Sequence, residues 1–381
     1  MLQEFLKTKP LYYKEIDYTR MSRAYASIKE KLKLPKIIHI IGTNGKGTTG
    51  RFLASALYKK GYNVLHYTSP HIIEFNERIW LNGQNINNAL LETLHDKLQI
   101  ILEQKFLDSL SYFEYTTFLA VLAAHESDYL ILEAGLGGEH DATAVFENIL
   151  TLVTPIDKDH EAFLGNSIES IATTKLNAIQ EKAILAKQKH NDVYDLAKKI
   201  STNKKVAFVK VEDYITQLDK DKIAKIAQKN KLPAYLVDNL RLSIAALKEL
   251  GISYLEDDFL GAKLFGRLTQ LSDNVLIDVG HNSLAAEAIY KVLKGKKFTF
   301  VYNSYKDKNY QNILTLLKPL IKEVQIIDVD DDRIEKKVKL ASVLATLKIP
   351  YREFQKVDIE ENYLVFGSFS VVEKFLKVYG G

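Results

Sequence analysis

The chain has 381 residues, of which 46% are hydrophobic and 26% charged, with a net charge of +4 at pH 7. This composition is typical of a globular protein, and the length suggests two domains that each bury a core. Because there is no cysteine, disulfides, thiol catalysis and cysteine-bound metals are excluded. The N-terminus lacks the apolar core of a signal peptide, and no apolar run approaches the roughly 20 residues of a membrane helix. We therefore expect a soluble, cytoplasmic protein.

Short apolar runs alternate with helical patterns from residue 36 onward. Strands are predicted at Lys36–Ile41, Asn63–Thr68, Tyr129–Glu133 and Ile149–Thr154. A helix is predicted at Thr48–Lys60, with Gly61 as its C-terminal cap. Strand, helix and strand in this order imply a parallel sheet covered on both faces. The lysine-rich run Asp219–Lys231 is typical of a solvated helix face.

The pattern restarts after Gly266, with a second set of strands and helices. Strands are expected at Asn274–Val279, Lys297–Tyr302, Glu323–Val329 and Asn362–Phe366, and helices at Leu284–Leu293, Tyr310–Leu317, Glu335–Leu347 and Ser370–Val378. The boundary falls near Gly261–Gly266, which gives domains 1–264 and 265–381. We expect an α/β protein with two domains, of which the C-terminal one is smaller.

A glycine loop, Gly42-Thr43-Asn44-Gly45-Lys46-Gly47-Thr48, joins the first strand to the first helix. It does not match the usual Gly-x-x-x-x-Gly-Lys-Ser/Thr pattern, because position 40 is Ile and Gly47 follows the lysine. Strand, glycine loop and helix are nevertheless the context of a phosphate loop. Lys46 would reach terminal phosphates, and the Thr48 hydroxyl would bind Mg²⁺. The plainer interpretation is a glycine-rich turn.

Polar residues also follow other predicted strands, where open α/β sheets bind their ligands. They are Ser69-Pro70-His71, the run from Glu133 to Gly138 with Asp141, the run Asp157–His160 with Lys175 beyond it, and Asp278–Asn282. Each has a plain alternative: a solvated Glu133, an ordinary loop His160, a surface Lys175 and a helix-capping Asp278. Together these groups suit Mg²⁺–ATP chemistry.

The sequence resembles the folylpolyglutamate synthase/dihydrofolate synthase family, a branch of the ATP-dependent Mur-type amide ligases. The phosphate loop of that family has the form Gly-Thr-Asn-Gly-Lys-Gly-Ser/Thr, which is intact at Gly42–Thr48. The resemblance runs in order through nearly the whole chain, at Ser69–His71, Glu77–Ile79, Phe113–Thr117, Glu133–Gly138, Asp141–Thr143, Asp159-His160, Leu164-Gly165, Ile171-Ala172, Asn239–Leu242, Gly266-Arg267, Asp278–Asn282 and Gly367-Ser368.

The resemblance implies an N-terminal P-loop ATPase-type parallel-sheet domain and a smaller C-terminal Rossmann-like α/β domain. It also implies roles for the matching residues. The loop residues Gly42, Thr43, Asn44, Gly45, Lys46, Gly47 and Thr48 would bind the ATP phosphates, with one Mg²⁺ at Thr48. A second metal ion would be held by Ser69, Glu133, His160 and Lys175, the last at the position of a lysine that CO₂ converts to a carbamate. Catalysis would rest on Lys46, Glu133, His160 and Lys175. Asn239 would contact adenine, and Arg267, Asp278 and His281 would complete the nucleotide site.

The implied reaction joins L-glutamate to a folate precursor, in folate biosynthesis and one-carbon metabolism. ATP would phosphorylate a carboxylate to an acyl phosphate, which the glutamate amine then attacks. The segment Leu11–Met21 resembles one that closes over dihydropteroate, so a bifunctional enzyme is expected, acting on dihydropteroate and reduced folates. Asp17, Phe113, Asp141 and His281 would bind substrates, although Asp17 also suits a helix cap. We expect a monomer that binds neither nucleic acid nor membranes.

The sequence departs from the family at several positions. Glu139 stands where arginine is usual, Thr174 and Leu176-Asn177 flank Lys175, and Phe265 replaces a proline. Three alternatives are a Mur enzyme of peptidoglycan synthesis, a nucleotide-dependent switch or kinase, and a catalytically silent binding protein. The first needs a UDP-binding domain, for which there is no room before Gly42. The second predicts ATP turnover that does not depend on glutamate.

Overall fold

The computed structural model describes residues 1–11 and 17–380 and divides into two compact units. The first unit comprises Met1–Leu232 and Leu236–Ala262, and the second comprises Pro233–Tyr235 and the chain from Lys263 onward. This division follows Ala262, close to the boundary at 264 that the sequence suggests. The roles assigned to the two domains stay predictions.

The sheet of the first unit has eight strands in the order β4-β3-β2-β5-β1-β6-β7-β8. The strands are β1 Lys36–Ile41, β2 Val64–Tyr67, β3 Ile79–Leu81, β4 Gln84–Asn85, β5 Tyr129–Glu133, β6 Leu150–Val153, β7 Lys182–Leu185 and β8 Ala207–Lys210. Six of them run parallel, and β3 and β4 add an antiparallel hairpin at one edge. The parallel strands direct their carboxyl ends to one side, where the phosphate loop begins.

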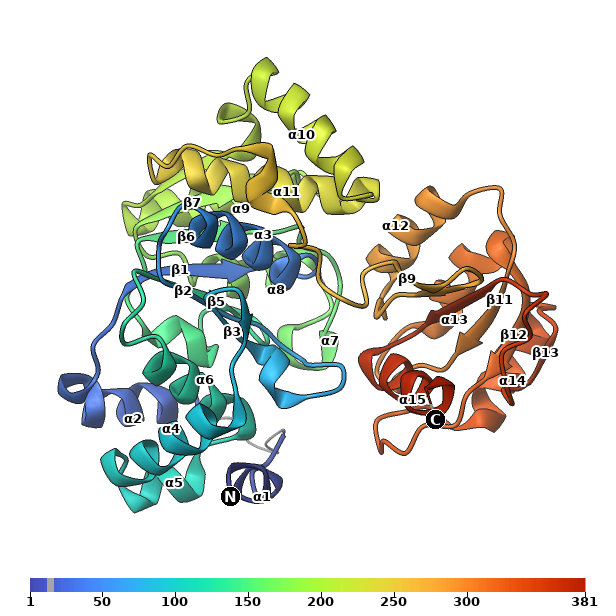
Figure 1. The fold of residues 1–381 in the computed structure, drawn as a ribbon, viewed down its shortest axis with the longest axis horizontal. Coiled ribbons are helices and arrows are strands. Elements are labelled where there is room, and N and C mark those ends of the chain that lie inside the picture. Colours follow the sequence, from blue (N-terminus) through green and yellow to red (C-terminus); the bar gives the residue numbers. More distant parts are fainter. Residues whose placement is uncertain (12–16, 381) are drawn as a thin grey trace. The chain divides into compact units, whose positions relative to one another are not determined.

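Helices cover both faces of this sheet (Figure 1). They are α1 Leu2–Lys7, α2 Arg20–Ile28, α3 Lys46–Lys59, α4 Asn88–Ile101, α5 Gln104–Ser109, α6 Tyr112–Ala123, α7 Glu161–Leu164, α8 Ile168–Leu176, α9 Asp192–Lys204, α10 Gln217–Lys229 and α11 Ala234–Glu249. Side chains of β1 alternate between the two faces. Ile38 and Ile40 pack with α3 and α11, whereas Ile37 and Ile41 pack with helices of the opposite face.

The second unit contains a six-stranded sheet in the order β13-β12-β11-β14-β10-β9, in which only β9 is antiparallel. The strands are β9 Thr269–Ser272, β10 Val275–Ile277, β11 Phe298–Tyr302, β12 Ile321–Ile326, β13 Tyr351–Glu353 and β14 Tyr363–Phe366. The helices are α12 Ser283–Leu293, α13 Tyr310–Leu317, α14 Lys337–Thr346 and α15 Phe369–Tyr379. The predicted fold, with two mostly parallel α/β sheets, is confirmed.

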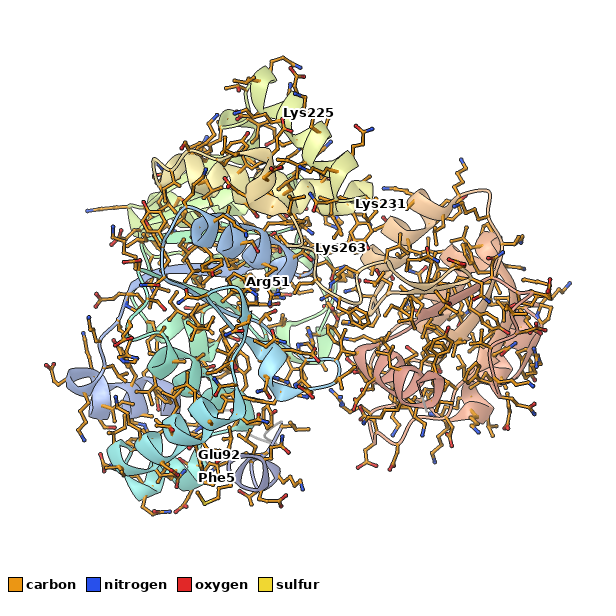
Figure 2. All side chains as sticks on the ribbon, in the orientation of Figure 1. Phe5, Arg51, Glu92, Lys225, Lys231 and Lys263 are labelled. Carbon is orange, nitrogen blue, oxygen red and sulfur yellow. The ribbon has the colours of Figure 1, made fainter. Side chains whose placement is uncertain are left out.

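Short 3₁₀ helices connect several of these elements: η1 Lys29–Lys31, η2 Phe75–Arg78, η3 Ala142–Val145, η4 Val211–Asp213, η5 Glu256–Phe259 and η6 Lys318–Leu320. The predicted solvated helix face is confirmed on α10, because Lys220, Lys225 and Lys229 are exposed. Figure 2 shows Lys225 on this helix. Within residues 1–11 and 17–380, every helix is too short or too polar to cross a lipid bilayer.

Candidate active site

The phosphate loop follows the carboxyl end of β1 and has a backbone that requires glycine at two positions. Gly42 and Gly45 have φ angles of 134° and 92°, in the region that favours glycine. A Cβ atom on Gly42 would also lie 2.8 Å from the carbonyl oxygen of Thr154. The Thr43 amide donates to the Pro155 carbonyl at 2.9 Å, which ties the loop to the segment after β6. The loop is therefore shaped by both neighbouring strands.

Lys46 and Thr48 stand in the first turn of α3, as expected for a phosphate loop. The Lys46 Nζ donates to the carbonyl oxygens of Gly42 and Thr43, both at 3.3 Å, and lies 4.0 Å from Glu133 Oε1. Thr48 is buried, and its Oγ1 has no hydrogen-bond partner among the described residues. A buried hydroxyl left unpaired is unfavourable, and hydroxyl oxygen is a ligand that suits Mg²⁺. Thr48 therefore fits the ion that the sequence predicts.

Glu133 ends β5 and is 5% exposed, so its interpretation as a solvated carboxylate is wrong. Its Oε2 accepts hydrogen bonds from the Thr68 hydroxyl and, at 3.3 Å, from the Ser69 amide. Its Oε1 faces Lys46. β2 and β5 are adjacent in the sheet, which is why the residues that follow β2 reach this carboxylate. Sequence reasoning missed Thr68, although its place at the end of a predicted strand was the available signal.

Lys175 lies in α8 and is 4% exposed, so its interpretation as a surface lysine is also wrong. Its Nζ donates to the Gly42 carbonyl at 3.0 Å, beside the phosphate loop. Burial, together with the charge of Lys46, lowers the pKa of Lys175 to about 7, although Asp159 and Asp141 oppose the shift. The lowered pKa makes the neutral amine more accessible near neutral pH than it is in an exposed lysine.

His160 follows β6 and precedes the short helix α7. It has a left-handed backbone with φ 53°, and its amide donates to the Asp159 carboxylate at 2.9 Å. Among the described residues, no three His, Asp or Glu side chains are grouped closely enough to hold a metal ion. The set predicted here instead mixes Ser69, Glu133 and His160 with Lys175. The structure brings Glu133 next to Ser69, and the ligand role of His160 stays a prediction.

Asp141 is buried and is bound to its own loop. Its Oδ2 accepts from the Leu136 amide at 2.8 Å, and its Oδ1 accepts from the Thr143 amide at 2.9 Å. Burial raises the pKa of this carboxyl, and these hydrogen bonds oppose the rise. The Phe113 ring lies against Gly135 of the same loop, where a Cβ atom would be 2.7 Å from the ring. Asp141 therefore shapes the glycine loop, and its contact with a pterin ring stays a prediction.

Asp17 comes directly after residues 12–16, which include Ile16 and lie outside the described residues. Its carboxylate accepts from the Thr19 amide at 2.9 Å and the Thr19 hydroxyl at 2.7 Å, just before α2. This arrangement favours the plain interpretation, in which Asp17 stabilises a helix start. The Tyr18 ring lies 4.3 Å from the His140 ring, which brings this segment to the loop of Asp141.

Asn239 lies on α11 against the phosphate loop. A Cβ atom on Gly45 would lie 3.0 Å from Asn239 Cγ, so the absence of a side chain at Gly45 permits this close packing. The hydroxyl of Ser243, one turn further along, donates to the Thr49 carbonyl at 2.8 Å. Helix α11 is thereby fixed against α3, and Asn239 is held beside the loop.

The predicted residues of the second unit gather in the loops that flank β9 and β10. Asp278 Oδ1 accepts from the Gly280 amide at 2.8 Å, and Oδ2 accepts from the Leu268 amide at 2.8 Å and the Tyr235 hydroxyl at 2.9 Å. Asn282 caps α12, so the prediction that Asp278 could cap it is wrong. The Arg267 guanidinium and the His281 ring both lie near Phe369, at 5.2 and 6.3 Å.

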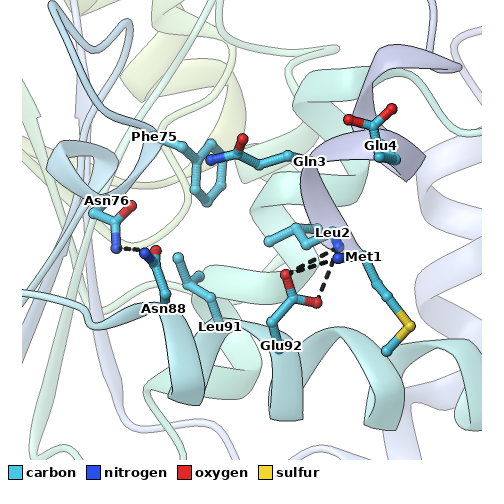
Figure 3. A pocket seen from close by; sticks show the side chains of 9 residues that line it. All are labelled: Met1, Leu2, Gln3, Glu4, Phe75, Asn76, Asn88, Leu91 and Glu92. Atoms are coloured by element: carbon cyan, nitrogen blue, oxygen red, sulfur yellow. Dashed lines mark hydrogen bonds and ion pairs between the residues drawn. The ribbon is translucent and has the colours of Figure 1, made fainter.

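A separate cavity of about 320 Å³ lies in the first unit between α1, η2 and α4 (Figure 3). It is lined in part by Gln3, Phe75, Asn76, Asn88 and Glu92. The Glu92 carboxylate accepts from the Leu2 amide at 3.0 Å, which fastens α1 to α4 at one side of the cavity. None of the predicted site residues lines it, so this cavity is not the phosphate site.

Comparison with known proteins decides the family. The chain is 32% identical to the dihydrofolate synthase/folylpolyglutamate synthase of Escherichia coli strain K12, over 82% of this chain and 78% of the relative. It also matches a structure of Helicobacter pylori folylpolyglutamate synthetase with 39% identity and a TM-score of 0.81, over 100% of this chain and 98% of that one. The chain belongs to the dihydrofolate synthase/folylpolyglutamate synthase family.

Membership of this family confirms the predicted class of enzyme, an ATP-dependent glutamate ligase that forms carbon–nitrogen bonds. A Yersinia pestis folylpolyglutamate synthase/dihydrofolate synthase complexed with AMPPNP and a Mn ion has the same fold, with 22% identity and a TM-score of 0.83 over 99% of this chain and 96% of that one. Of the protein-family models compared with the sequence, none matches. The peptidoglycan, switch and silent-protein alternatives are not supported.

Proposed function

We propose that the protein carries both activities of its family, adding L-glutamate to dihydropteroate and to reduced folates with ATP as co-substrate. One observation carries the proposal. The Lys46 and Lys175 amines both donate to the carbonyl of Gly42 in the phosphate loop, and the Glu133 carboxylate lies beside Lys46. These groups come from three different elements and gather where the γ-phosphate of ATP would be bound by a loop of this kind.

The proposed reaction proceeds in two steps. A carboxylate oxygen of the acceptor attacks the γ-phosphorus of ATP, which forms an acyl phosphate and releases ADP. The glutamate amine then attacks the acyl carbon, and inorganic phosphate leaves as the amide forms and the amine proton is lost. Phosphorylation is needed because a carboxylate has no good leaving group.

The protein's part in this chemistry is positioning and neutralisation of charge. Backbone amides of Gly42, Thr43, Asn44, Gly45 and Gly47 would hold the phosphates, and Lys46 would turn from the Gly42 carbonyl to the γ-phosphate. Mg²⁺ bound at Thr48, and a second divalent ion at Ser69, Glu133, His160 and Lys175, would screen the phosphate charge. A Y. pestis relative with the same fold is complexed with AMPPNP and a Mn ion, which supports binding of a nucleotide and a divalent ion here.

Lys175 would serve the second ion as a carbamate. A neutral amine is needed to attack CO₂, and the low pKa of Lys175 supplies one at neutral pH. The modification replaces an ammonium by a carboxylate-like group, which suits a cation site. The Glu133 carboxylate would add a second oxygen ligand.

Asn239 would contact the adenine, and Arg267, Asp278 and His281 would complete the nucleotide site, with His281 also orienting glutamate. The pterin would bind between the N-terminal segment and the loop of Asp141, with Phe113 beside the ring and Asp17 and Asp141 as hydrogen-bond partners. The contact of Tyr18 with His140 supports this location. The protein would act in the cytoplasm as a monomer.

The test is to incubate the protein with Mg²⁺–ATP and L-glutamate, with dihydropteroate or tetrahydrofolate as acceptor. We expect a glutamate-dependent gain in product mass with both acceptors, together with ADP release. A gain with one acceptor alone would restrict the protein to a single activity. ADP release without either product would contradict the ligase assignment.

A further inference from the structure

Arg78 is a buried cation in the first unit whose charge is not balanced by a carboxylate of the described residues. It ends η2, is 8% exposed, and keeps its proton at physiological pH. We propose that Arg78 binds the carboxylate of a reduced folate that is not phosphorylated, and so allows the enzyme to use reduced folates as well as dihydropteroate. This inference rests on the proposed function, in which both compounds are acceptors.

The contacts of the Arg78 guanidinium leave most of its donors unused. Its Nε donates to His71 Nδ1 at 2.8 Å, and its Cζ lies 5.0 Å from the centre of the Tyr112 ring. An imidazole carries no negative charge, so His71 does not balance the guanidinium. Within the described part of the chain, the two terminal nitrogens of Arg78 have no hydrogen-bond or ion-pair partner. Because a buried charge without a counter-ion is unfavourable, this arrangement indicates an anionic ligand.

The carboxylates close to Arg78 along the chain and in the sheet are occupied by other groups. Glu77, its neighbour in η2, accepts three hydrogen bonds of 2.8 to 2.9 Å from the backbone amides of Ile72–Glu74. Glu133 accepts from the hydroxyl and the amide of the residues that follow β2, and it faces Lys46. We therefore assign the counter-ion of Arg78 to a substrate.

Arg78 is connected to both parts of the site that the acceptor would join. Its carbonyl oxygen accepts from the Thr68 amide at 2.9 Å, and the Thr68 hydroxyl binds Glu133 on the phosphate side. Tyr112, over whose ring the guanidinium lies, directly precedes Phe113, the residue proposed beside the pterin ring. All of these residues belong to the first unit. We therefore place the bound anion near the reacting end of the acceptor.

The two acceptors differ in their number of carboxylates. Dihydropteroate has one, which must be the group that is phosphorylated. A reduced folate ends in glutamate and has two, so that one is phosphorylated and the other remains an anion in the site. An arginine can bind such a carboxylate through two parallel hydrogen bonds, which a lysine cannot reproduce. Arg78 thus supplies a contact that the folate needs and dihydropteroate does not.

The first test compares Arg78→Met with wild type in the full-length enzyme, with each acceptor in turn. We expect the KM for tetrahydrofolate to rise about 30-fold, because a charge-assisted pair is lost. The KM for dihydropteroate should stay within about threefold, since it makes no such pair. A selective rise in the KM for ATP or L-glutamate would assign Arg78 to that anion, and equal rises for both acceptors would indicate a structural role. Either result would overturn the proposal.

Arg51→Met is the matched control, because Arg51 Cζ also lies 5.0 Å from the centre of an aromatic ring, that of Trp80. Arg51 lies in α3 of the first unit and has no role in the proposed site (Figure 2). This variant should lose stability in thermal unfolding and keep the wild-type ratio of the two acceptor KM values. An equal change of that ratio in Arg51→Met and Arg78→Met would show that the effect is not specific to Arg78.

The second test measures binding of tetrahydrofolate by calorimetry, together with two analogues in which γ-aminobutyrate or norvaline replaces its glutamate. Each analogue lacks one of the two carboxylates. Wild type should bind the analogue without the carboxylate that faces Arg78 more weakly than tetrahydrofolate, whereas Arg78→Met should bind the two about equally. The comparison is a double-mutant cycle between the side chain and the carboxylate. Equal penalties in both proteins would contradict the role of Arg78.

These measurements separate the inference from the proposed function. Calorimetry does not require turnover, so a wild type that binds tetrahydrofolate but ligates no glutamate would refute the proposed function alone. A wild type that does not bind tetrahydrofolate would overturn the inference. If Arg78→Met does not fold, Arg78→Lys keeps the charge but not the paired donors, and its KM should still rise more for tetrahydrofolate than for dihydropteroate. Equal changes for both acceptors in Arg78→Lys would count against the proposal.

Discussion

Lys46 and Lys175 meet at a single acceptor, the carbonyl oxygen of Gly42, to which their Nζ atoms donate at 3.3 and 3.0 Å. Two ammonium groups on one buried carbonyl repel each other, which helps to explain the low pKa of Lys175. Conversion of Lys175 to a carbamate would turn this repulsion into an attraction. In the proposed function, this repulsion would favour conversion of Lys175 to the carbamate.

Lys46→Ala should abolish turnover while the protein remains folded. Without the ammonium, charge on the transferred phosphoryl group is left unbalanced, and we expect kcat to fall at least about 100-fold. ADP release and product mass measure the loss, and circular dichroism monitors the fold. Lys59→Ala, at the exposed end of the same helix, is the control and should retain activity. Turnover at the wild-type rate in Lys46→Ala would refute the phosphate-loop assignment.

Lys175→Arg should be inactive, because a guanidinium keeps its proton and cannot form a carbamate. Wild type depleted of CO₂ near pH 7 should lose activity and regain it when bicarbonate is added. Intact-protein mass would show the gain of one CO₂ in wild type and none in the variant. Full activity of Lys175→Arg, or indifference of the wild type to bicarbonate, would argue against the carbamate.

From the sequence we could predict which residues gather at the site, but not how buried they are or which hydrogen bonds hold them. The loop Gly42–Thr48 follows one predicted strand and Glu133 ends another, so we expected both to lie at the same edge of the sheet. The burial of Lys175 could not be inferred, because it depends on α8 packing against Gly138, where a Cβ atom would lie 2.7 Å from Lys175 Cα. The bond from Tyr235 to Asp278 joins residues 43 positions apart and leaves no local signal.

At the scale of elements, the phosphate loop depends on glycine backbone geometry. Gly42→Ala should destabilise the protein by about 2–4 kcal/mol, because it combines an unfavourable φ with overpacking against Thr154. Gly61→Ala is the matched control, since its φ is 89° but a Cβ atom there would meet nothing within 4 Å. Urea unfolding would measure both. A smaller loss for Gly42→Ala than for Gly61→Ala would contradict this account.

Prediction of the elements succeeded where strands are long and buried on both faces. The strands Lys36–Ile41 and Tyr129–Glu133 have the predicted bounds, and residues 310–317 form the predicted helix. The hairpin of β3 and β4 was missed, although Asn82-Gly83, with φ angles of 46° and 100°, is a known hairpin turn signal. β13 was missed because its three exposed residues show no alternating pattern.

At the scale of the molecule, the buried His39 and His66 and the partly buried His71 should make the first unit sensitive to acid. Burial lowers the pKa of His39 to about 4, burial and Arg78 lower that of His71 to about 4, and burial with Arg51 lowers that of His66 well below its usual range. Between pH 6.5 and 4 the unfolded chain binds more protons than the folded one. Stability should therefore fall as pH decreases through this window, by about 3 kcal/mol for His39 alone.

Urea titrations at pH 7.5 and 5 would test this, followed by the fluorescence of Trp80, the single tryptophan of the chain, which lies in the first unit. His39→Asn should show a weaker pH dependence than wild type. His125→Asn, whose ring is half exposed, should match wild type. An identical pH dependence in wild type and His39→Asn would exclude His39 as a source of the effect.

The short edge strands β4 and β13 affect how the protein should behave at high concentration. An unpaired edge strand can template association with another chain when it is long and apolar. Here β4 consists of two exposed polar residues, and β13 of three exposed residues that include Arg352 and Glu353. Both strands are short and polar, so they offer few unpaired backbone groups to a strand of another chain. We therefore expect concentrated or refolding protein to resist amyloid-like assembly through β4 and β13.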